Sequence, residues 1–290
     1  MENITGTNTH KLLGLVSLYH PDLHEAVGNI MRYLPYLDRL IIWDNSPLEC
    51  NLQKQMMPTF EKDREKIEWR GDGENHFIAA AVNYAWQYAE AHNYDLLLLM
   101  DQDSQWEGFP AFRKQVELCF LENPNRVFCP YVFGNDTFTI TDDIQEKKVF
   151  INSGTVIPVH ILHAVGGADE QFPLDALDYD LACRILNAGY TIVSLTKHQL
   201  HHTVGNVLRM GAFHILTCNY SAERIYSIAR SHVLYLRKHG KSLSLSENWH
   251  IIKEHYIMMP MRVLLADPQK CKRLRCFFSG IYDGLTYKLS

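Results

Sequence analysis

The stretch Tyr94-Asp95-Leu96-Leu97-Leu98-Leu99-Met100-Asp101-Gln102-Asp103-Ser104 decides the fold. Four leucines and a methionine are followed at once by two carboxylates one residue apart, which is typical of a buried strand that ends where the sheet meets solvent. In an open α/β sheet, ligands bind at the carboxyl ends of the strands, so we expect Asp101 and Asp103 to face a ligand crevice. Two such carboxylates suit a divalent cation that also holds phosphate oxygens. A second Asp-x-Asp, at Asp178 and Asp180, is a reminder that the triplet also fits a soluble acidic turn.

The composition restricts the class of protein. The chain has 290 residues, of which 47% are hydrophobic and 21% charged, and its net charge is -5. This suits either one large α/β domain or a domain plus a helical appendage, and the mild acidity argues against a dedicated nucleic-acid binder. The sequence lacks the run of about 18 apolar residues that a membrane span needs, and the apolar segment at 12–18 is too short and too early for a signal peptide. With seven scattered cysteines and no Cys-x-x-Cys pair, we expect a cytoplasmic protein.

Strand and helix patterns alternate along the chain. The expected strands cover residues 11–19, 37–43, 67–70, 94–101, 127–133, 138–141 and 191–195. The first helix is expected to carry Pro21 in its first turn, and another is expected at 78–92. This alternation predicts a largely parallel, doubly wound sheet.

Polar or aromatic residues follow four successive strands, at Tyr19, Asp44, Asn75 and Asp101. Because the carboxyl ends of parallel strands share one edge, all four should face one nucleotide-sized crevice. There Tyr19 would stack on a base, Asp44 would accept from a ring N–H, Asp101 would hold ribose hydroxyls or a metal, and Asp103 would hold the metal beneath a diphosphate. The Asp-Asn-Ser run after the second strand also fits a simple turn. No GxGxxG or GxxxxGK[ST] follows the first strand, so neither a dinucleotide fold nor a P-loop NTPase is supported.

A second acidic segment runs from Asp175 to Arg184 and is typical of a helix start, with Gly189 as its C-terminal cap. Asp175 and Asp178 are expected on one helical face, and Asp180 and Arg184 are expected to pair on another. Asp178 is then a candidate base. The alternative, which the local sequence alone favours, is an ordinary acidic first turn that complements the helix dipole.

The remaining candidates lie towards the C-terminus. His202, in an expected loop, would complete a metal site with the two aspartates, although a lone loop histidine is more often solvated. Arg224 and Arg230 are six apart on a helix expected at 219–239, so we expect one to face the site and the other to be exposed. A hydrophobic helix at 251–265 precedes a basic and aromatic stretch at 270–278. That stretch suits either an anionic membrane surface or a solvated face.

In this order the segments resemble the family 2 glycosyltransferases of the GT-A fold, specifically the bacterial rhamnosyltransferase-like branch. The matching segments are Tyr19-His20-Pro21, Asp44-Asn45-Ser46, Glu74 to Asn83, Met100 to Ser104, Asn152-Ser153-Gly154, Gly166 to Glu170, Asp175 to Arg184, His202 to Gly205 and Arg224 to Arg230. Together they cover roughly residues 10 to 240. The chain departs from the family pattern at Phe77, where glycine is usual, at Ser231, where asparagine is usual, and modestly at Leu174 and Ala176-Leu177.

The resemblance implies an α/β fold of the GT-A type, with a Rossmann-like, mostly parallel central sheet flanked by helices. It implies a glycosyltransferase domain over 1–240, with a nucleotide-binding half at about 10–104 and an acceptor half at about 105–240, and a C-terminal helical extension over 241–290. The implied reaction is inverting and metal-dependent, and moves a sugar from a nucleotide-diphosphate donor to a hydroxyl of a surface polysaccharide or lipid-linked glycan. The family points to dTDP-L-rhamnose as donor, with a UDP-hexose as the alternative.

The resemblance also implies residue roles. Asp178 is the base, and Asp101, Asp103 and His202 hold Mg²⁺ or Mn²⁺. The nucleotide-sugar contacts are Tyr19, Pro21, Asp44, Asn45, Asn75, Asn83, Asp101 and Gln102. The acceptor or diphosphate contacts are Asp175, Arg184, Arg224, Tyr226 and Arg230.

Two other classes compete with the transferase. A nucleotidyltransferase would usually need a glycine-rich, basic loop after the first strand, which Tyr19-His20-Pro21 is not. A non-catalytic nucleotide-sugar-binding protein of the same fold is opposed by the intact aspartates but kept open by Phe77. The basic tail adds an expected peripheral contact with the inner face of the cell membrane.

Overall fold

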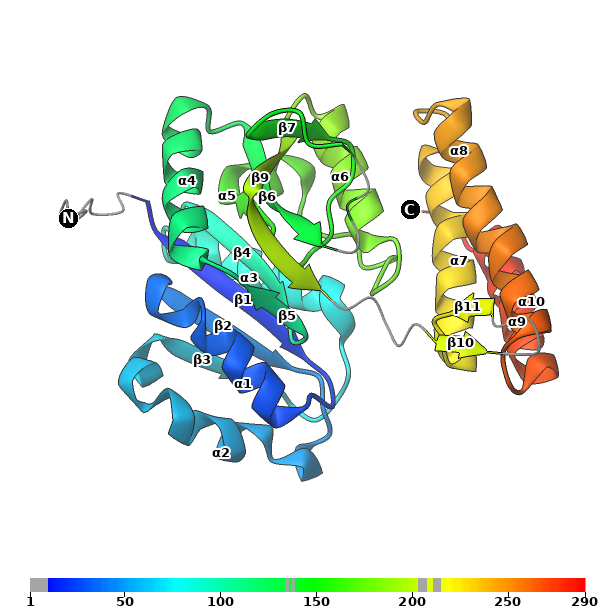
Figure 1. Cartoon of the computed structure of the whole chain (residues 1–290), viewed down its shortest axis with the longest axis horizontal. Coiled ribbons are helices and arrows are strands. Elements are labelled where there is room, and N and C mark those ends of the chain that lie inside the picture. Colours follow the sequence, from blue (N-terminus) through cyan, green and yellow to red (C-terminus); the bar gives the residue numbers. More distant parts are fainter. Residues whose placement is uncertain (1–9, 134–135, 137–138, 203–207, 211–214, 290) are drawn as a thin grey trace. The chain divides into compact units, whose positions relative to one another are not determined.

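The computed structural model describes residues 10–133, 136, 139–202, 208–210 and 215–289. The chain forms two compact units (Figure 1). The first comprises Met1–Glu170 and Leu181–His202, and the second comprises Gln171–Asp180 and Thr203–Ser290. The sequence predicts a functional boundary at residue 240, between a glycosyltransferase domain and a helical extension. The two units are defined by compactness alone, so this boundary stays a prediction.

A nine-stranded sheet forms the centre of the first unit (Figure 1). Its strands are β1 (Leu12–Leu18), β2 (Arg39–Asp44), β3 (Ile67–Arg70), β4 (Leu96–Asp101), β5 (Ser104–Trp106), β6 (Arg126–Phe133), β7 (Ile144–Lys147), β8 (Val156–Pro158) and β9 (Thr191–His202). Their order is β3-β2-β1-β4-β8-β6-β9-β5, and β7 also pairs with β9. The first four strands are parallel, whereas β8 runs antiparallel to β4 and β6. The sheet is therefore mixed but parallel across β3, β2, β1 and β4, which agrees with the predicted mostly parallel sheet.

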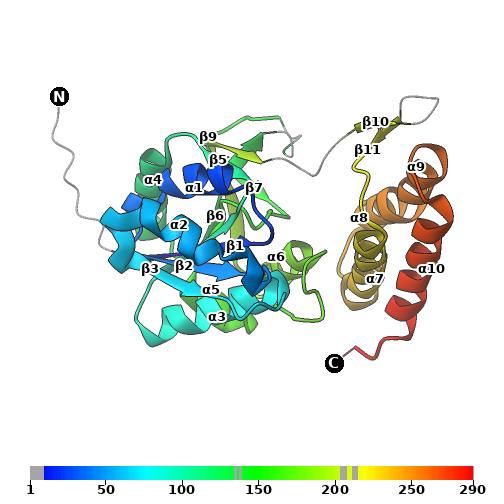
Figure 2. The same ribbon diagram turned by 90° about the horizontal axis from the view of Figure 1, so that it is seen from below.

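Helices cover both faces of this sheet. They are α1 (Leu23–Met31), α2 (Leu52–Met56), α3 (Phe77–Ala91), α4 (Phe109–Glu122), α5 (Val159–Val165) and, across both units, α6 (Leu177–Asn187), with short 3₁₀ turns η1 (Leu34–Tyr36), η2 (Leu48–Cys50) and η3 (Met57–Lys66). Figure 2 shows α1 and α4 on one side of the sheet and α3 and α5 on the other. Because both faces are covered, the central strands are apolar throughout: every residue from Leu96 to Met100 is buried.

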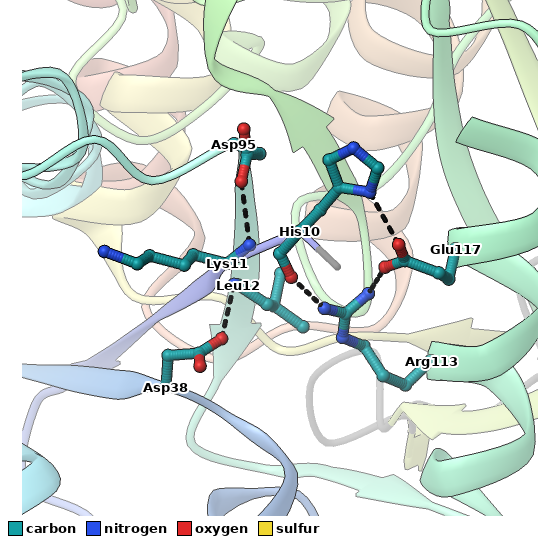
Figure 3. A network of polar contacts seen from close by, with 7 residues as sticks. All are labelled: His10, Lys11, Leu12, Asp38, Asp95, Arg113 and Glu117. Carbon is teal, nitrogen blue, oxygen red and sulfur yellow. Dashed lines mark hydrogen bonds and ion pairs between the residues drawn. The ribbon is translucent and has the colours of Figure 1, made fainter. Parts of the chain in front are cut away.

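The amino end of β1 is fixed by side chains from three other elements (Figure 3). Asp95 accepts from the backbone N of Lys11 at 2.8 Å, and Asp38 accepts from that of Leu12 at 2.7 Å. Arg113 of α4 pairs with Glu117 at 2.9 Å and also donates to the carbonyl of His10. These contacts hold the strand at the end of the sheet opposite to the candidate site.

The structure corrects four local predictions. Helix α1 begins at Leu23 with Asp22 as its N-cap, so Pro21 lies before the helix rather than in its first turn. Residues 139–141 are not in a strand, Phe138 lies outside the described residues, and the strand that follows is β7. His202 lies in a strand rather than a loop, and Asp175 lies before its helix rather than in it.

The second unit contains a short hairpin and a bundle of helices. Its elements are β10 (Leu208–Met210), β11 (Ile215–Thr217), α7 (Ala222–His239), α8 (Leu245–Ile252), the π-helix η4 (Lys253–Met258), α9 (Met259–Leu265) and α10 (Lys270–Thr286). Helices α7 and α10 pack closely because Gly280 and Gly284 face α7: a Cβ on Gly280 would lie 2.4 Å from the carbonyl oxygen of Tyr226. In the described residues, no helix is both long enough and apolar enough to cross a membrane.

Candidate functional site

The strand ends that carry the candidate residues are aligned in the sheet. Ser17 of β1 lies opposite Asp101 of β4, and Leu18 lies opposite Asp44 of β2. The carboxyl ends of these three parallel strands therefore meet at one edge, which is where an open α/β sheet binds ligands.

At this edge Asp101, Asp103 and His202 form a group that could hold a metal ion. One possible ligand atom from each residue lies within 4.8 Å of the others. His202 Nδ1 is 3.5 Å from Asp103 Oδ1 and 2.8 Å from Ser104 Oγ. Two carboxylates and an imidazole can hold a divalent cation, and a hydroxyl beside the ring helps to orient it.

His202 reaches the aspartates because β9 is longer than predicted. The strand was expected to end at 195, with His202 in a loop, but it continues to His202 as its last residue. There it pairs antiparallel with β5, so that His202 lies opposite Ser104. The prediction of a loop histidine was wrong, and the pairing of strands places the ring. Gly205 of the H-x-x-G segment lies outside the described residues.

A loop from the second half of the sheet supports Asp101. The backbone N of Asp101 lies 3.2 Å from Ser153 Oγ, and Gly154 N donates to the Leu99 carbonyl at 2.8 Å. Gly154 has φ +80°, and a Cβ there would lie 2.8 Å from side-chain atoms of both Leu200 and Pro130. The Ser-Gly pair in Asn152-Ser153-Gly154 therefore allows a close approach to β4.

The loop after β1 carries Tyr19, a residue that is 52% exposed. Tyr19 N donates to Gln102 Oε1 at 2.7 Å, and Gln102 Nε2 donates to the Tyr19 carbonyl at 3.2 Å. The next residue, His20, donates its backbone N–H to Ser46 Oγ at 2.9 Å. The loops after β1, β2 and β4 are thus joined, with the Tyr19 ring left accessible.

The predicted contacts Asp44 and Asn75 each accept a hydrogen bond from the backbone two residues later, whereas Asn45 bonds to residues of β1, β2 and the loop before α3. Asp44 Oδ1 accepts from Ser46 N at 2.9 Å, and Asn75 Oδ1 accepts from Phe77 N at 2.9 Å. Asn45 is buried: its Oδ1 accepts from Trp43 Nε1 and His76 N, and its Nδ2 donates to Ser17 Oγ. Direct contact of these residues with a nucleotide stays a prediction.

Asn83 joins α3 to the loop before residue 170. Its Oδ1 accepts from Ala168 N at 2.7 Å, and its Nδ2 donates to the Ala168 carbonyl and to Glu170 Oε1, each at 3.0 Å. A Cβ on Gly167 would lie 2.6 Å from Asn83 Oδ1. Arg184 holds the same loop through the carbonyls of Val165 at 2.7 Å and Gly167 at 2.8 Å.

In the second unit, Asp175 is a buried carboxylate paired with Arg224. Arg224 NH2 lies 2.9 Å from Asp175 Oδ1. Burial raises the pKa of Asp175, and the neighbouring Arg224 guanidinium opposes that rise. Asp175 was expected on the helix, on one face with Asp178, but α6 begins at Leu177 after Ala176 adopts φ +60°. Asp175 thus precedes the helix and meets α7.

Asp178 and Asp180 both lie in the first turn of α6. Asp178 is half-buried, and its Oδ1 accepts from Tyr179 N at 3.0 Å. Asp180 is fully buried and contacts Lys238 at 2.8 Å and His239 at 2.7 Å. The two aspartates therefore differ in environment, and its half-burial makes Asp178 the more accessible. The predicted pairing of Asp180 with Arg184 stays a prediction.

Tyr226 and Arg230 lie further along α7. The Tyr226 hydroxyl donates to Asp283 at 2.7 Å, and Arg230 donates to the Gln171 carbonyl at 3.2 Å and lies over the Tyr287 ring. Arg224 is thus bound to an acid, whereas Arg230 is held by a carbonyl and a ring.

The structure brings Asp101, Asp103 and His202 together and joins Gln102 to Tyr19. The candidates Asp175, Asp178, Arg224, Tyr226 and Arg230 belong to the second unit. Sequence reasoning did not single out Ser104 or Ser153 as supports. The sequence signal for Ser104 was its place beside the Asp-x-Asp. Its contact with His202, 98 residues later, depends on the pairing of β5 with β9.

No protein-family model matches the chain, and no curated protein matches it. Solved structures do. The chain is similar to GalNAc-T7, solved with UDP, GalNAc and Mn²⁺ (TM-score 0.56, 9% identity, 85% of this chain and 54% of that one). It is also similar to the mannosyltransferase PcManGT from Pyrobaculum calidifontis, solved with GDP-Man and Mn²⁺ (TM-score 0.57, 13% identity, 97% and 78%).

A third similar structure is S. aureus TarS 1-349 in complex with UDP-GlcNAc (TM-score 0.58, 13% identity, 95% of this chain and 80% of that one). The chain spans about half the length of GalNAc-T7 and most of the other two. At these identities the likeness shows the fold, and it confirms the predicted α/β fold of the GT-A type with a helical C-terminal part. The rhamnosyltransferase branch is not addressed by it.

Proposed function

We propose that the chain is a metal-dependent glycosyltransferase that uses a nucleotide-diphosphate sugar. The observation that carries the proposal is the group of Asp101, Asp103 and His202, with ligand atoms within 4.8 Å of one another at the carboxyl end of β4. The group lies in a fold shared with proteins solved with UDP or GDP-Man and Mn²⁺.

The residues present fit Mg²⁺ or Mn²⁺. Carboxylate oxygens are preferred by both ions, and an imidazole is more easily accommodated by Mn²⁺. Ser104 beside the ring and Ser153 beside the Asp101 backbone would fix the ligands before a cation binds. The bound cation would neutralise charge on the departing diphosphate.

The donor would lie against the loops after β1, β2 and β4. The exposed ring of Tyr19 is suited to stack on a base, and Gln102 holds the backbone that carries it. Pro21, Asp44, Asn45, Asn75, Asn83 and Asp101 complete the proposed donor contacts. Of these, Asn45 already joins the loop after β2 to His76, and Asn83 joins α3 to Ala168, so their part is to hold the segments that surround the donor.

Asp178 is the proposed base. Removal of a proton from the acceptor hydroxyl by a positioned carboxylate is worth about 10²- to 10⁴-fold in rate. A single displacement at the anomeric carbon, without a covalent intermediate, inverts its configuration. Asp175, Arg184, Arg224, Tyr226 and Arg230 are proposed to position the acceptor or diphosphate. The resemblance of the Asp175 to Arg184 segment to the family pattern supports these roles.

The proposed identities of the donor and the acceptor rest on the sequence resemblance. It favours dTDP-L-rhamnose as donor and a surface polysaccharide or lipid-linked glycan as acceptor. A UDP-hexose is the alternative donor, and the UDP and UDP-GlcNAc found in similar structures favour testing it equally. A non-catalytic binding protein of the same fold would bind the donor without turnover.

The test is a screen of dTDP-, UDP- and GDP-sugars with and without Mn²⁺ or Mg²⁺, by thermal shift and by nucleotide release. We expect one sugar nucleotide to stabilise the protein only with metal, and slow hydrolysis to release its nucleotide. Asp103→Asn should lose the metal-dependent shift, whereas Glu61→Gln, at an exposed acid of η3, should keep it. No response to any sugar nucleotide would refute the proposal, and binding without release would favour the non-catalytic alternative.

A further inference from the structure

The solvent-facing side of the helix formed by α8, η4 and α9 is apolar. Most of its exposed residues are large and hydrophobic: Leu245, Trp249, Ile252, Ile257, Met261, Leu264 and Leu265. Leu245 is 90% exposed and Trp249 is 58% exposed. The exposed polar residues of the same helix are Ser246, His250 and Lys253. An exposed apolar surface of this kind marks an interaction site.

The π-helical segment η4 keeps this surface on one side. Leu245, Trp249 and Ile252 follow the four- and three-residue steps of an α-helical face, as do Ile257, Met261 and Leu264. The step from Ile252 to Ile257 is five residues, which on an α-helix would turn the second set away from the first. A π-helix forms i→i+5 bonds and so absorbs the extra residue. We call the residues of these two sets, with Leu265, the apolar helix face.

Helix α10 adds exposed aromatic and basic residues. Phe278 and Tyr282 are 61% and 66% exposed, and Leu285 continues the same spacing. Lys270, Lys272 and Arg275 are exposed in its first two turns. Lys272 contacts Glu223 of α7 at 3.4 Å. A helix with basic residues and exposed aromatic residues suits a membrane interface.

The exposed charges that residues 245–289 contribute have one sign, and the exposed acid of α7 beside them, Glu223, pairs with Lys272. From residue 245 to 289, all of which the structure describes, no aspartate or glutamate is exposed. The four acids present are engaged within the unit: Glu247 with Ser244, Glu254 with Arg262, Asp267 with Arg273 and Asp283 with Tyr226. The exposed charges are therefore basic, although the whole chain carries a net charge of -5.

We propose that the apolar helix face and the basic residues Lys253, Lys270, Lys272 and Arg275 dock the protein on an anionic phospholipid bilayer. Apolar side chains would enter the acyl boundary while the lysines and arginine contact lipid phosphates. A second copy of the chain is a poorer occupant, because it would bring two basic surfaces together. The proposal does not depend on the transfer reaction, since binding to lipid is measured without a sugar donor.

The test is co-sedimentation of the full chain with vesicles of phosphatidylcholine alone and of phosphatidylcholine mixed with phosphatidylglycerol. We expect at least about tenfold tighter binding to the anionic vesicles, falling as salt rises. Lys270→Gln/Lys272→Gln/Arg275→Gln should weaken that binding by more than about 100-fold, since each basic residue at the surface contributes about fivefold. The matched control is Lys54→Gln/Lys62→Gln/Lys114→Gln, which removes three exposed lysines from the first unit and should leave binding intact.

The apolar contribution is tested separately with Leu245→Ser/Trp249→Ser, against Leu118→Ser/Leu121→Ser on the exposed side of α4. Only the first pair should reduce binding, by at least about tenfold, because each side chain loses burial in the acyl boundary. Trp249 fluorescence should shift to shorter wavelength on anionic vesicles, a change absent in Trp249→Phe. Thermal unfolding of each variant shows whether it is folded. Failure to bind anionic vesicles, or a concentration-dependent dimer abolished by Leu245→Ser/Trp249→Ser, would overturn the proposal.

Discussion

Gln102 and Tyr19 hold each other by two reciprocal hydrogen bonds, from Tyr19 N to Gln102 Oε1 at 2.7 Å and from Gln102 Nε2 to the Tyr19 carbonyl at 3.2 Å. The Gln102 carbonyl in turn accepts from Asn29 of α1 at 3.1 Å. The residue between the two candidate metal ligands is thus tied to the loop that would stack on the base. The pair of bonds requires a side chain that both donates and accepts, which the amide of Gln102 does.

Gln102→Ala should weaken donor use while leaving the fold intact. Two hydrogen bonds of about 1 kcal/mol each are lost, so we expect kcat/KM for the donor to fall by roughly tenfold or more. Gln105→Ala, at the exposed middle residue of β5, is the matched control and should behave as wild type. An unchanged kcat/KM in Gln102→Ala would show that the Tyr19 loop keeps its position without this pair.

Asp178→Asn should strongly reduce turnover and spare donor binding. The amide keeps the shape of the side chain but cannot take a proton, so kcat should fall by about 10²- to 10⁴-fold. The metal-dependent thermal shift with the donor should stay as in wild type, because Asp103 and His202 are untouched. Asp142→Asn, at an exposed position, provides the control. Turnover at the wild-type rate would assign the base to another group.

The parts of the fold with strong apolar patterns were predictable from sequence. Strands β1, β2, β4 and β6 lie where the pattern placed them, because continuous apolar runs bounded by turn residues have few other solutions. Strand β3 also lies where it was predicted, although its four residues alternate between apolar and charged. The metal group was also predictable in part, since both aspartates follow such a run. What placed His202 was its pairing with β5, which local sequence does not encode.

Local conformations decided by tertiary contacts were missed. The segment at 138–141 has strand propensity, but in this part of the chain it is β7, at 144–147, that pairs with β9. Asp175 was assigned to the helix because its spacing from Asp178 fits one turn. The structure instead gives Ala176 a left-handed conformation and pairs Asp175 with Arg224, 49 residues later. An ion pair between residues so far apart cannot be predicted from the spacing of residues along the sequence.

Phe77→Gly should be more stable than Phe77→Ala. Phe77 has φ +61°, a conformation that glycine adopts freely and other residues adopt at a cost. Phe77 is 41% exposed, and both substitutions remove its ring, but only glycine relieves the backbone. We expect a difference of about 1 kcal/mol in the free energy of unfolding, measured with urea. Equal stabilities would mean that the first turn of α3 rearranges to a negative φ in the alanine variant.

His232 should make the protein less stable as the pH falls below neutrality. The ring is buried on α7, stacks on His255 with centroids 3.5 Å apart, meets the edge of Tyr179, and has Nδ1 2.9 Å from the Ile228 carbonyl. Burial lowers the pKa of His232 to about 4, and it lowers the pKa of His255 too, with His232, His250 and Arg262 contributing.

The sign of the effect follows from linkage. Above the unfolded pKa of 6.5 both states are neutral and stability is full; as the pH falls towards 4, the unfolded chain takes the proton first. Between pH 7 and 5, His232 alone should remove roughly 2 kcal/mol from the free energy of unfolding. In urea unfolding, the free energy of unfolding of His232→Gln should fall correspondingly less between pH 7 and 5, with His255 still contributing to the fall. The control His24→Gln, at an exposed position of α1, should match wild type. Equal losses in wild type and His232→Gln would show that His232 is solvated, or already protonated, in the folded protein.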